Sequence, residues 1–185
     1  CVTVDPVTAR DFDDAVSCEP LSGGGWRLGV HIADVSHYVR PGTPIDLEAR
    51  ARTCSAYLVD RVIAMLPEQL CNDACSLVPG QDRLSMSVLC DIDAGGEVLC
   101  SEACCSAIRS KARLSYDEVD GMLDGAASDD LPCVEGVDPA AVAGMLRELD
   151  ALASARRKVR RRRGSVDFET VEAKVDLGEG GVPVG

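Results

Sequence analysis

The sequence of residues 3–15 reads Thr3-Val4-Asp5-Pro6-Val7-Thr8-Ala9-Arg10-Asp11-Phe12-Asp13-Asp14-Ala15. A short apolar run ends at Asp5, and Pro6 prevents that run from continuing as a regular strand. Three further aspartates then crowd one turn, at Asp11, Asp13 and Asp14. Four carboxylates at close range repel one another unless cations neutralise them, so the spacing indicates a divalent metal site. Carboxylate oxygens are hard ligands, which favour Mg²⁺ or Mn²⁺ over Zn²⁺.

Two other interpretations of the acidic cluster compete with this one. An Asp-x-Asp-Asp run is often only a solvated loop, so the motif alone is a weak signal. An EF-hand fits poorly, because a calcium loop that starts at Asp11 needs glycine and glutamate where the chain has Val16 and Ser22. The cluster by itself therefore indicates metal binding without a defined function.

Further blocks of sequence follow the acidic cluster in a fixed order. They are Trp26-Arg27-Leu28-Gly29-Val30-His31-Ile32-Ala33-Asp34-Val35-Ser36-His37-Tyr38-Val39, Asp60-Arg61-Val62-Ile63-Ala64-Met65-Leu66-Pro67-Glu68, Asn72-x-x-Cys75-Ser76-Leu77, Ala112-Arg113-Leu114-Ser115-Tyr116 and Arg163-Gly164-Ser165-Val166-Asp167-Phe168. With the acidic cluster, these blocks closely resemble the catalytic (RNB) domain of the ribonuclease II and ribonuclease R family of 3′-to-5′ exoribonucleases. The resemblance is strong over residues 3–123, weak in the acidic segment that follows, and returns at 160–175. Several blocks in the right order are far more specific than one motif.

The resemblance implies a role for each of five residues. Asp5, Asp11, Asp13 and Asp14 match the four catalytic aspartates of the family, which hold magnesium at the scissile phosphate. Tyr57 matches a tyrosine that stacks on a base at the 3′ end of single-stranded RNA, although without the resemblance an ordinary packed aromatic is the better interpretation. Two Mg²⁺ ions roughly 4 Å apart would activate the attacking water and stabilise the leaving 3′ oxygen, which releases nucleoside 5′-monophosphates.

The division of labour among the aspartates is an expectation of its own. We expect Asp5 and Asp14 to lie nearest the scissile phosphate, and Asp11 and Asp13 to complete the second metal site. An alternative is that the chain is a truncated or inactive RNB fragment that only binds RNA or metal.

Two groups of cations are candidates for RNA contact. Arg109, Lys111 and Arg113 alternate, so on one strand they would share a face, where they would contact RNA phosphates or form a solvated edge. We expect Arg113 to be a substrate-binding residue. The segment 156–163 holds seven cations in eight residues, which fits either a solvated helix end or a direct RNA contact.

The charge of the chain argues against nucleic-acid binding at first sight. The 185 residues carry a net charge of −12, whereas such proteins usually have a basic footprint. Part of the excess is local, because four of the 31 acidic residues belong to the proposed metal site and others lie in the acidic variable segment 117–138. The family normally carries small RNA-binding barrels on both sides of its catalytic domain, and the resemblance implies that these would supply further grip on RNA.

Ten cysteines could suggest a secreted disulfide scaffold, but the chain is long and core-forming. Zinc is disfavoured because the segments Cys71–Cys75 and Cys100–Cys105 lack paired Cys-x2-Cys spacing. There is no apolar run long enough for a membrane span and no signal-peptide pattern, so we expect no membrane association and a cytoplasmic location. The oligomeric state is left open.

Hydrophobic periodicity predicts an α+β domain built on a mostly antiparallel sheet with flanking helices. Hairpins are expected at 15–32, where Trp26 should pack, and at 85–108, and helices at 44–54 and 139–163, the second with a basic end. His31 and His37 are expected to be core or supporting groups, and residues 128–132 to form a loop. The chain has no initiating methionine and stops in the glycine-rich segment 178–185, so we expect an RNB domain that is incomplete at its C-terminus.

Overall fold

The computed structural model describes residues 1–166, 175, 178, 182 and 184. Asp167 and Phe168, at the end of the last family block, lie outside the described residues, as does most of the glycine-rich segment 178–185. Eight strands and four α-helices account for most of the described chain, joined by two short helical turns of other types.

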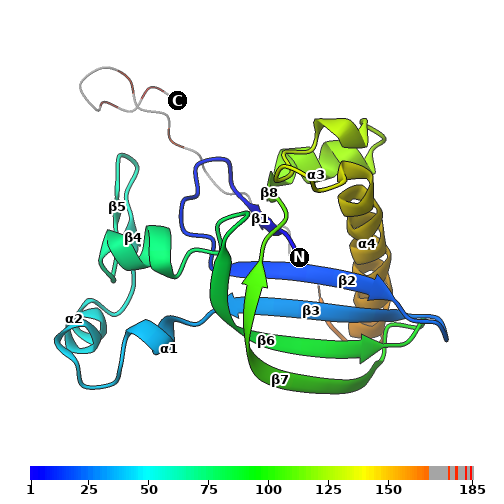
Figure 1. The fold of residues 1–185 in the computed structure, drawn as a ribbon, viewed down its shortest axis with the longest axis horizontal. Coiled ribbons are helices and arrows are strands. Elements are labelled where there is room, and N and C mark those ends of the chain that lie inside the picture. The colour runs from blue at the N-terminus through cyan, green and yellow to red at the C-terminus, as the bar shows by residue number, and fades with distance from the viewer. Residues whose placement is uncertain (167–174, 176–177, 179–181, 183, 185) are drawn as a thin grey trace.

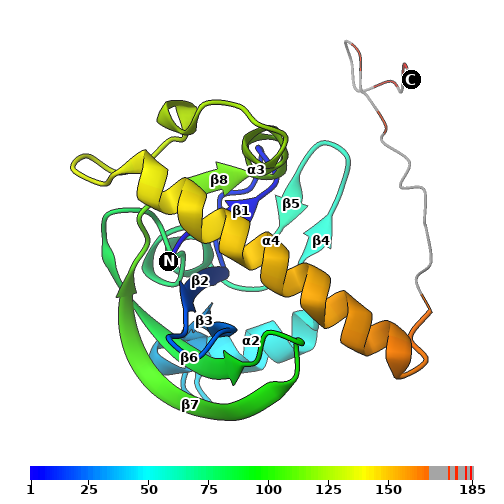
Figure 2. The ribbon, with the colours of Figure 1, turned by 90° about the vertical axis from the view of Figure 1, so that its right-hand side faces the viewer.

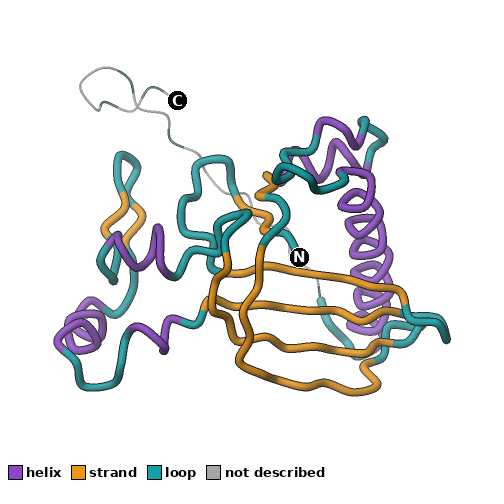
Figure 3. The backbone as a smooth tube through the Cα atoms, viewed as in Figure 1, coloured by secondary structure: helices purple, strands orange, loops and turns teal. Residues whose placement is uncertain are grey.

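A curved antiparallel sheet of four strands forms the centre of the fold (Figures 1 and 3). Its strands, in spatial order, are β2 (Asp14–Pro20), β3 (Trp26–Ala33), β6 (Asp82–Ile92) and β7 (Val98–Arg109). The β2–β3 turn requires glycine, because Gly25 has φ +87° and a Cβ there would lie 2.2 Å from the carbonyl oxygen of Ile92. Both hairpins expected from the sequence are present, and the mostly antiparallel α+β architecture is confirmed.

A second, two-stranded sheet positions the start of the chain. β1 (Thr3–Asp5) pairs in parallel with β8 (Arg113–Ser115), so that Asp5 lies opposite Ser115. Val2 also bridges to Val16 of β2, which ties this pair to the edge of the central sheet. Two family blocks more than 100 residues apart therefore lie side by side (Figure 1).

The long helix α4 (Pro139–Arg162) packs across the central sheet (Figure 2). Asp138 caps it by accepting a hydrogen bond from the Ala140 N–H, and proline occupies its first turn. Trp26 packs against the helix, and its Nε1 donates to Glu148 at 2.7 Å. Two hydrophobic clusters pack against α4. The cluster on its N-terminal half consists of Val2, Ala112, Leu114, Met122, Leu131, Val142, Ala143 and Leu146. The second cluster, farther along the helix, consists of Cys18, Ile92 and Leu152.

The remaining elements lie on the side of the sheet away from α4 (Figure 1). They are α1 (Val35–Tyr38), α2 (Pro44–Arg52), the small hairpin of β4 (Ala56–Tyr57) and β5 (Val62–Ile63), and a π-helical turn, η1 (Leu70–Ala74). The helix expected at 44–54 is present as α2, which begins at Pro44 and is capped by Thr43. Within the described residues, no helix has both the length and the apolar character needed to cross a membrane.

The expectation that Arg109, Lys111 and Arg113 share one strand face is wrong. β7 ends at Arg109, which pairs with Asp82 at 2.7 Å, and a new strand begins only at Arg113. Between them the buried Ser110 turns the backbone, since its hydroxyl donates to the Ala112 carbonyl at 3.0 Å. The three cations therefore point into different surroundings.

The acidic segment 117–138 contains more helix than its composition suggested. α3 (Tyr116–Leu123) begins with a complete capping box, in which Ser115 and Glu118 satisfy each other's backbone N–H groups. The loop expected at 128–132 includes a 3-10 turn, η2 (Ser128–Asp130). Met122 of α3 is buried in the core on the N-terminal half of α4.

Candidate functional site

The aspartate loop, residues 6–13, connects β1 to β2 and carries the candidate site. Asp5 is the last residue of β1 and Asp14 is the first of β2, while Asp11 and Asp13 lie on the loop between them. The four aspartates predicted from the sequence thus belong to one short segment at the junction of the two sheets (Figure 1).

Hydrogen bonds from Ser76, Leu77 and Ala33 hold the main chain of the aspartate loop. Ser76 is fully buried; its hydroxyl accepts from the Phe12 N–H at 3.0 Å and donates to the Arg10 carbonyl at 3.1 Å. The Leu77 N–H donates to the Phe12 carbonyl at 2.8 Å, and the Ala33 N–H donates to the Asp13 carbonyl at 2.8 Å. These bonds use main-chain groups of the loop and leave its carboxylates available to a ligand.

Arg113 anchors the other side of the same loop. Its Nη2 donates to the carbonyl oxygens of Pro6 and Val7, each at 2.8 Å. The guanidinium also lies 5.6 Å from the centre of the Phe12 ring, which is within cation–π range. In this structure Arg113 therefore shapes the aspartate loop, and its role as a direct contact to RNA stays a prediction.

The carboxylates of the site carry unfavourable charge. Burial, and next the charge of Asp14, raises the pKa of Asp5. Partial burial and the charges of Asp11 and Asp14 likewise raise the pKa of Asp13. Oδ2 of Asp5 is buried and has no hydrogen-bond partner among the described residues. A buried acceptor without a donor is costly, and a cation is one ligand that removes the cost.

The donor set fits a hard divalent cation, since it consists of carboxylate oxygens with one orphaned acceptor at Asp5. The side chains do not converge into a closed cage: nowhere in the described part of the chain do three His, Cys, Asp or Glu side chains gather closely enough to hold a metal ion. Four like charges spread apart unless a cation lies between them. The loop therefore brings the aspartates into one neighbourhood without fixing a ligand geometry.

Tyr57 projects from the β4–β5 hairpin toward this neighbourhood. Its side chain is 69% exposed, and its hydroxyl lies 3.5 Å from Oδ2 of Asp11. The negative charge of Asp11 is the main cause of a raised pKa for the Tyr57 phenol. A large exposed aromatic ring beside a group of carboxylates can stack on a base while the adjacent phosphate faces the site.

The two histidines take no part in the site. His31 is buried in the central sheet, with Nε2 at 3.0 Å from the Ser17 hydroxyl and Nδ1 at 2.6 Å from the Ser87 hydroxyl. His37 lies exposed in α1, where its ring packs edge-on against Tyr38. The expectation of a core or supporting role therefore agrees with the structure for His31.

The sequence alone does not indicate that Ser76 is a positioning residue. It falls within a block that carried the family resemblance, but nothing local indicates that its hydroxyl reaches Arg10 and Phe12, more than 60 residues away. The same is true of Arg113, whose partners lie more than 100 residues away. The only available signal was the co-occurrence of the blocks.

Known proteins resemble this chain in sequence and in fold. The RNB domain pattern matches residues 1–185. Ribonuclease R of Thermotoga maritima is 45% identical over 181 residues, which cover 97% of this chain and 24% of that protein. The Arabidopsis thaliana protein named inactive exonuclease DIS3L2 is 40% identical over 188 residues, covering 99% of this chain and 18% of the relative.

Among solved structures, Mycoplasma genitalium RNase R in complex with ribose-methylated single-stranded RNA superimposes with a TM-score of 0.90. It is 35% identical, and the match covers 99% of this chain and 27% of that one. The chain thus spans about a quarter or less of the length of the curated relatives it matches.

Proposed function

Because this chain belongs to the RNB domain family, we propose that it is the aspartate-bearing part of an exoribonuclease that degrades single-stranded RNA from its 3′ end. The products would be nucleoside 5′-monophosphates. The observation that carries the proposal is the position of Tyr57, whose hydroxyl lies 3.5 Å from Asp11 on the aspartate loop. A stacking platform and a group of hard oxygen ligands side by side are what hydrolysis of a terminal phosphodiester without sequence preference requires.

In this proposal Asp5, Asp11, Asp13 and Asp14 hold divalent cations, with Mg²⁺ the first choice and Mn²⁺ also suitable. When bound, such ions supply a water nucleophile at neutral pH and stabilise charge on the phosphate oxygens. Asp5 and Asp14 stand at the two strand ends and are proposed to lie nearest the scissile phosphate. The raised pKa values of Asp5 and Asp13 support cation binding, because burial and then the neighbouring carboxylates disfavour the charged form of each group, and a bound cation favours that form.

The chain's own residues position the substrate and the ligands. The Tyr57 ring would stack on the 3′-terminal base, and Ser76 and Arg113 keep the aspartate loop in place through main-chain carbonyls. Since a misplacement of about 1 Å can cost about 100-fold in rate, these anchors are expected to matter for turnover although neither faces the phosphate.

A cytoplasmic location is part of the same proposal. All ten cysteines are free in the structure, and four of them are exposed or half-buried on the sheet strands β6 and β7: Cys90, Cys100, Cys104 and Cys105. Free, accessible thiols suit a reducing compartment.

An inactive nuclease-like protein is the second candidate, and one observation favours it: a relative with 40% identity is named an inactive exonuclease. The presence of aspartate at all four positions of this chain supports the enzyme instead. A direct assay separates the two.

The test is degradation of a 5′-labelled single-stranded oligoribonucleotide by the chain in the presence of Mg²⁺. We expect progressive shortening from the 3′ end, release of nucleoside 5′-monophosphates, and no reaction in EDTA. Asp13→Asn should lower turnover by more than about 100-fold while leaving RNA affinity in EDTA unchanged. Asp124→Asn, at the exposed end of α3, is the matched control. Normal turnover by Asp13→Asn would contradict the assignment, and RNA binding without any hydrolysis by the wild-type chain would favour the inactive alternative.

A further inference from the structure

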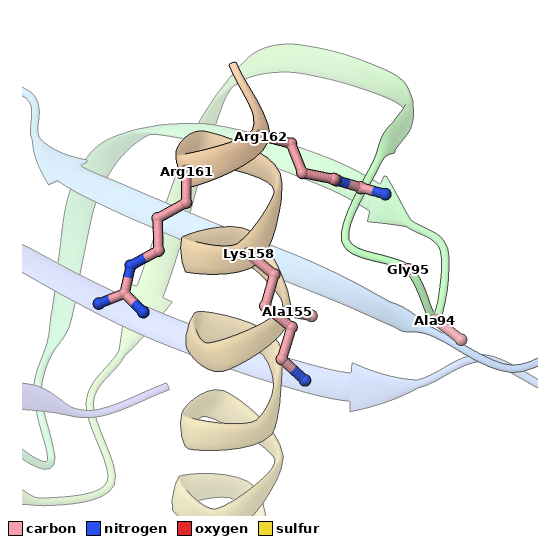
Figure 4. A pocket seen from close by; sticks show the side chains of 6 residues that line it. All are labelled: Ala94, Gly95, Ala155, Lys158, Arg161 and Arg162. Carbon is pink, nitrogen blue, oxygen red and sulfur yellow. The ribbon is translucent and has the colours of Figure 1, made fainter. Parts of the chain in front are cut away.

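The C-terminal end of α4 forms a basic surface that is separate from the aspartate site. A pocket of about 580 Å³ lies between this helix end and the β6–β7 turn, lined by Ala94, Gly95, Ala155, Lys158, Arg161 and Arg162 (Figure 4). We call these six residues the basic surface. All three of its charged members are cations.

The pocket has a fixed frame because the β6–β7 turn is locked onto α4. Gly96 has φ +88°, and a Cβ there would lie 2.7 Å from the carbonyl carbon of Ala155, so only glycine allows this approach. Nη1 of Arg156 donates to the Gly96 carbonyl at 2.6 Å. The spacing between the turn and the helix is therefore set by backbone contacts, and the lining cations project from a rigid base.

Carboxylates neutralise only part of the charge in this region. Glu97 contacts Arg162 at 3.5 Å and also pairs with Arg163, while Arg157 lies 3.7 Å from Asp150. The side-chain ammonium group of Lys158 has neither an ion pair nor a hydrogen bond within the described part of the chain. The segment 156–163 holds seven of the chain's 19 cations. The surface thus keeps a positive charge on a protein whose net charge is −12.

We propose that the basic surface binds the phosphate backbone of single-stranded RNA upstream of the 3′ end that enters the aspartate site. This inference rests on the proposed function for its ligand. The ligand of this surface is a polyanion, because Lys158 and Arg162 occupy positions i and i+4 of α4 and line the pocket, and such side chains contact phosphates without reading bases. An acidic chain can hold RNA electrostatically only where its cations are concentrated, and this is the densest run of cations it has.

The distance between the two sites sets the RNA length that can reach both. Leu146 packs with Val2 and Leu114, which flank the strand that ends at Asp5. From Leu146 to Arg162 the helix spans about 24 Å. A stacked strand advances about 3.4 Å per nucleotide and an unstacked one up to about twice that, so an RNA of about seven nucleotides or more spans this length in any conformation, whereas a dinucleotide does not.

The alternative explanation is that the cations only stabilise the helix end, where the partial negative charge of the helix dipole favours them. That role predicts a change in thermal stability and none in RNA affinity. Removing Lys158 and Arg162 by substitution with glutamine keeps helix propensity high and changes charge alone.

The experiment compares Lys158→Gln/Arg162→Gln with a control that removes the same charge elsewhere, Arg40→Gln/Arg147→Gln. Arg147 lies exposed on the same helix, and Arg40 lies exposed after α1. Binding of fluorescent oligoribonucleotides is measured in EDTA, so that no hydrolysis occurs, together with the melting temperature of each variant. For an RNA of about 20 nucleotides we expect about tenfold weaker binding by the basic-surface variant, and a salt-dependence slope reduced by about 1.4.

For a dinucleotide, which is too short to reach both sites, we expect equal affinity for both variants. Equal affinity of the two variants for the long RNA would overturn the inference, as would an equal loss for short and long RNA, or an absence of RNA binding by the wild-type chain. The proposed function is judged separately by Mg²⁺-dependent hydrolysis. A chain that binds long RNA through this surface and hydrolyses nothing would keep the inference and remove the function.

Discussion

The guanidinium of Arg113 donates to the carbonyl oxygen of Pro6 at 2.8 Å, across 107 residues of sequence. This bond joins the first residue of β8 to the first residue of the aspartate loop. Because a second bond reaches Val7 and the Phe12 ring lies beneath the guanidinium, one side chain fixes both ends of the loop. An arginine beside a group of carboxylates can serve as a phosphate ligand; here the geometry indicates a positioning residue.

Replacing Arg113 separates positioning from phosphate contact. Arg113→Met removes both hydrogen bonds to the aspartate loop and should lower the free energy of unfolding by about 1–3 kcal/mol. Turnover of RNA should fall by about 10- to 100-fold, because the aspartates lose their alignment. Affinity for RNA in EDTA and its salt dependence should stay unchanged, as measured by fluorescence anisotropy.

Arg109→Met is the control, since the Arg109–Asp82 pair is exposed and worth no more than about 1 kcal/mol. If Arg113→Met instead weakens RNA binding and flattens its salt dependence while the melting temperature holds, Arg113 is a phosphate ligand as first predicted.

The Tyr57 ring should bind RNA by its face and not through its hydroxyl. Tyr57→Ala is expected to weaken binding of a single-stranded oligoribonucleotide by about 1–3 kcal/mol, while Tyr57→Phe retains most of the affinity. Salt dependence should be the same for all three proteins, because stacking releases no counterions. Isothermal titration in EDTA measures both quantities.

Tyr38→Ala, on α1, provides a control for loss of an exposed aromatic ring. A large loss for Tyr57→Phe would show that the contact between the hydroxyl and Asp11 carries the effect.

The elements that the sequence predicted well are those specified by neighbours in the chain. The α4 start follows from Asp138-Pro139, because capping and a proline in the first turn act within a few residues. The start of α3 is also specified by neighbouring residues, since Ser115 and Glu118 form a capping box. The acidic composition of the surrounding segment obscured that signal.

The parts that the sequence did not predict depend on long-range pairing. Parallel pairing of β1 with β8 brings Asp5 beside Ser115, and no local pattern specifies which distant strand a three-residue strand will join. For the same reason the spacing of the aspartates predicted the loop, whereas the anchors Ser76 and Arg113 became apparent only in three dimensions.

The buried His31 should make stability depend on pH. Burial lowers its pKa below the usual value of about 6.5. As pH falls below about 6.5, the unfolded chain gains a proton that the folded chain does not, so the free energy of unfolding decreases until the pH passes below the folded-state pKa. Urea denaturation from neutral to mildly acid pH should show this loss in the wild type and less of it in His31→Gln.

His31→Gln should also cost about 1–2 kcal/mol at neutral pH, because its contacts to Ser17 and Ser87 are disturbed. His37→Gln, in exposed α1, is the control and should follow the wild-type pH curve. If His31→Gln follows it too, His31 is not the group whose protonation drives the loss.

Magnesium should stabilise the folded chain through the aspartate loop. Burial and Asp14 raise the pKa of Asp5, so in the absence of cations the folded state loses stability as pH rises through that raised pKa and the carboxyl ionises. At neutral pH the carboxylates thus repel, and Mg²⁺ at about 100 times its dissociation constant should add about 2.7 kcal/mol. That corresponds to a rise in melting temperature of about 5–10 °C for a domain of this size, measurable by calorimetry against NaCl of equal ionic strength.

Asp5→Asn should abolish most of the rise and leave the metal-free protein at least as stable as the wild type, because it removes a buried charge that has no partner. Asp124→Asn should retain the full Mg²⁺ response. A rise of the same size in Asp5→Asn would place the binding of Mg²⁺ elsewhere on this acidic chain.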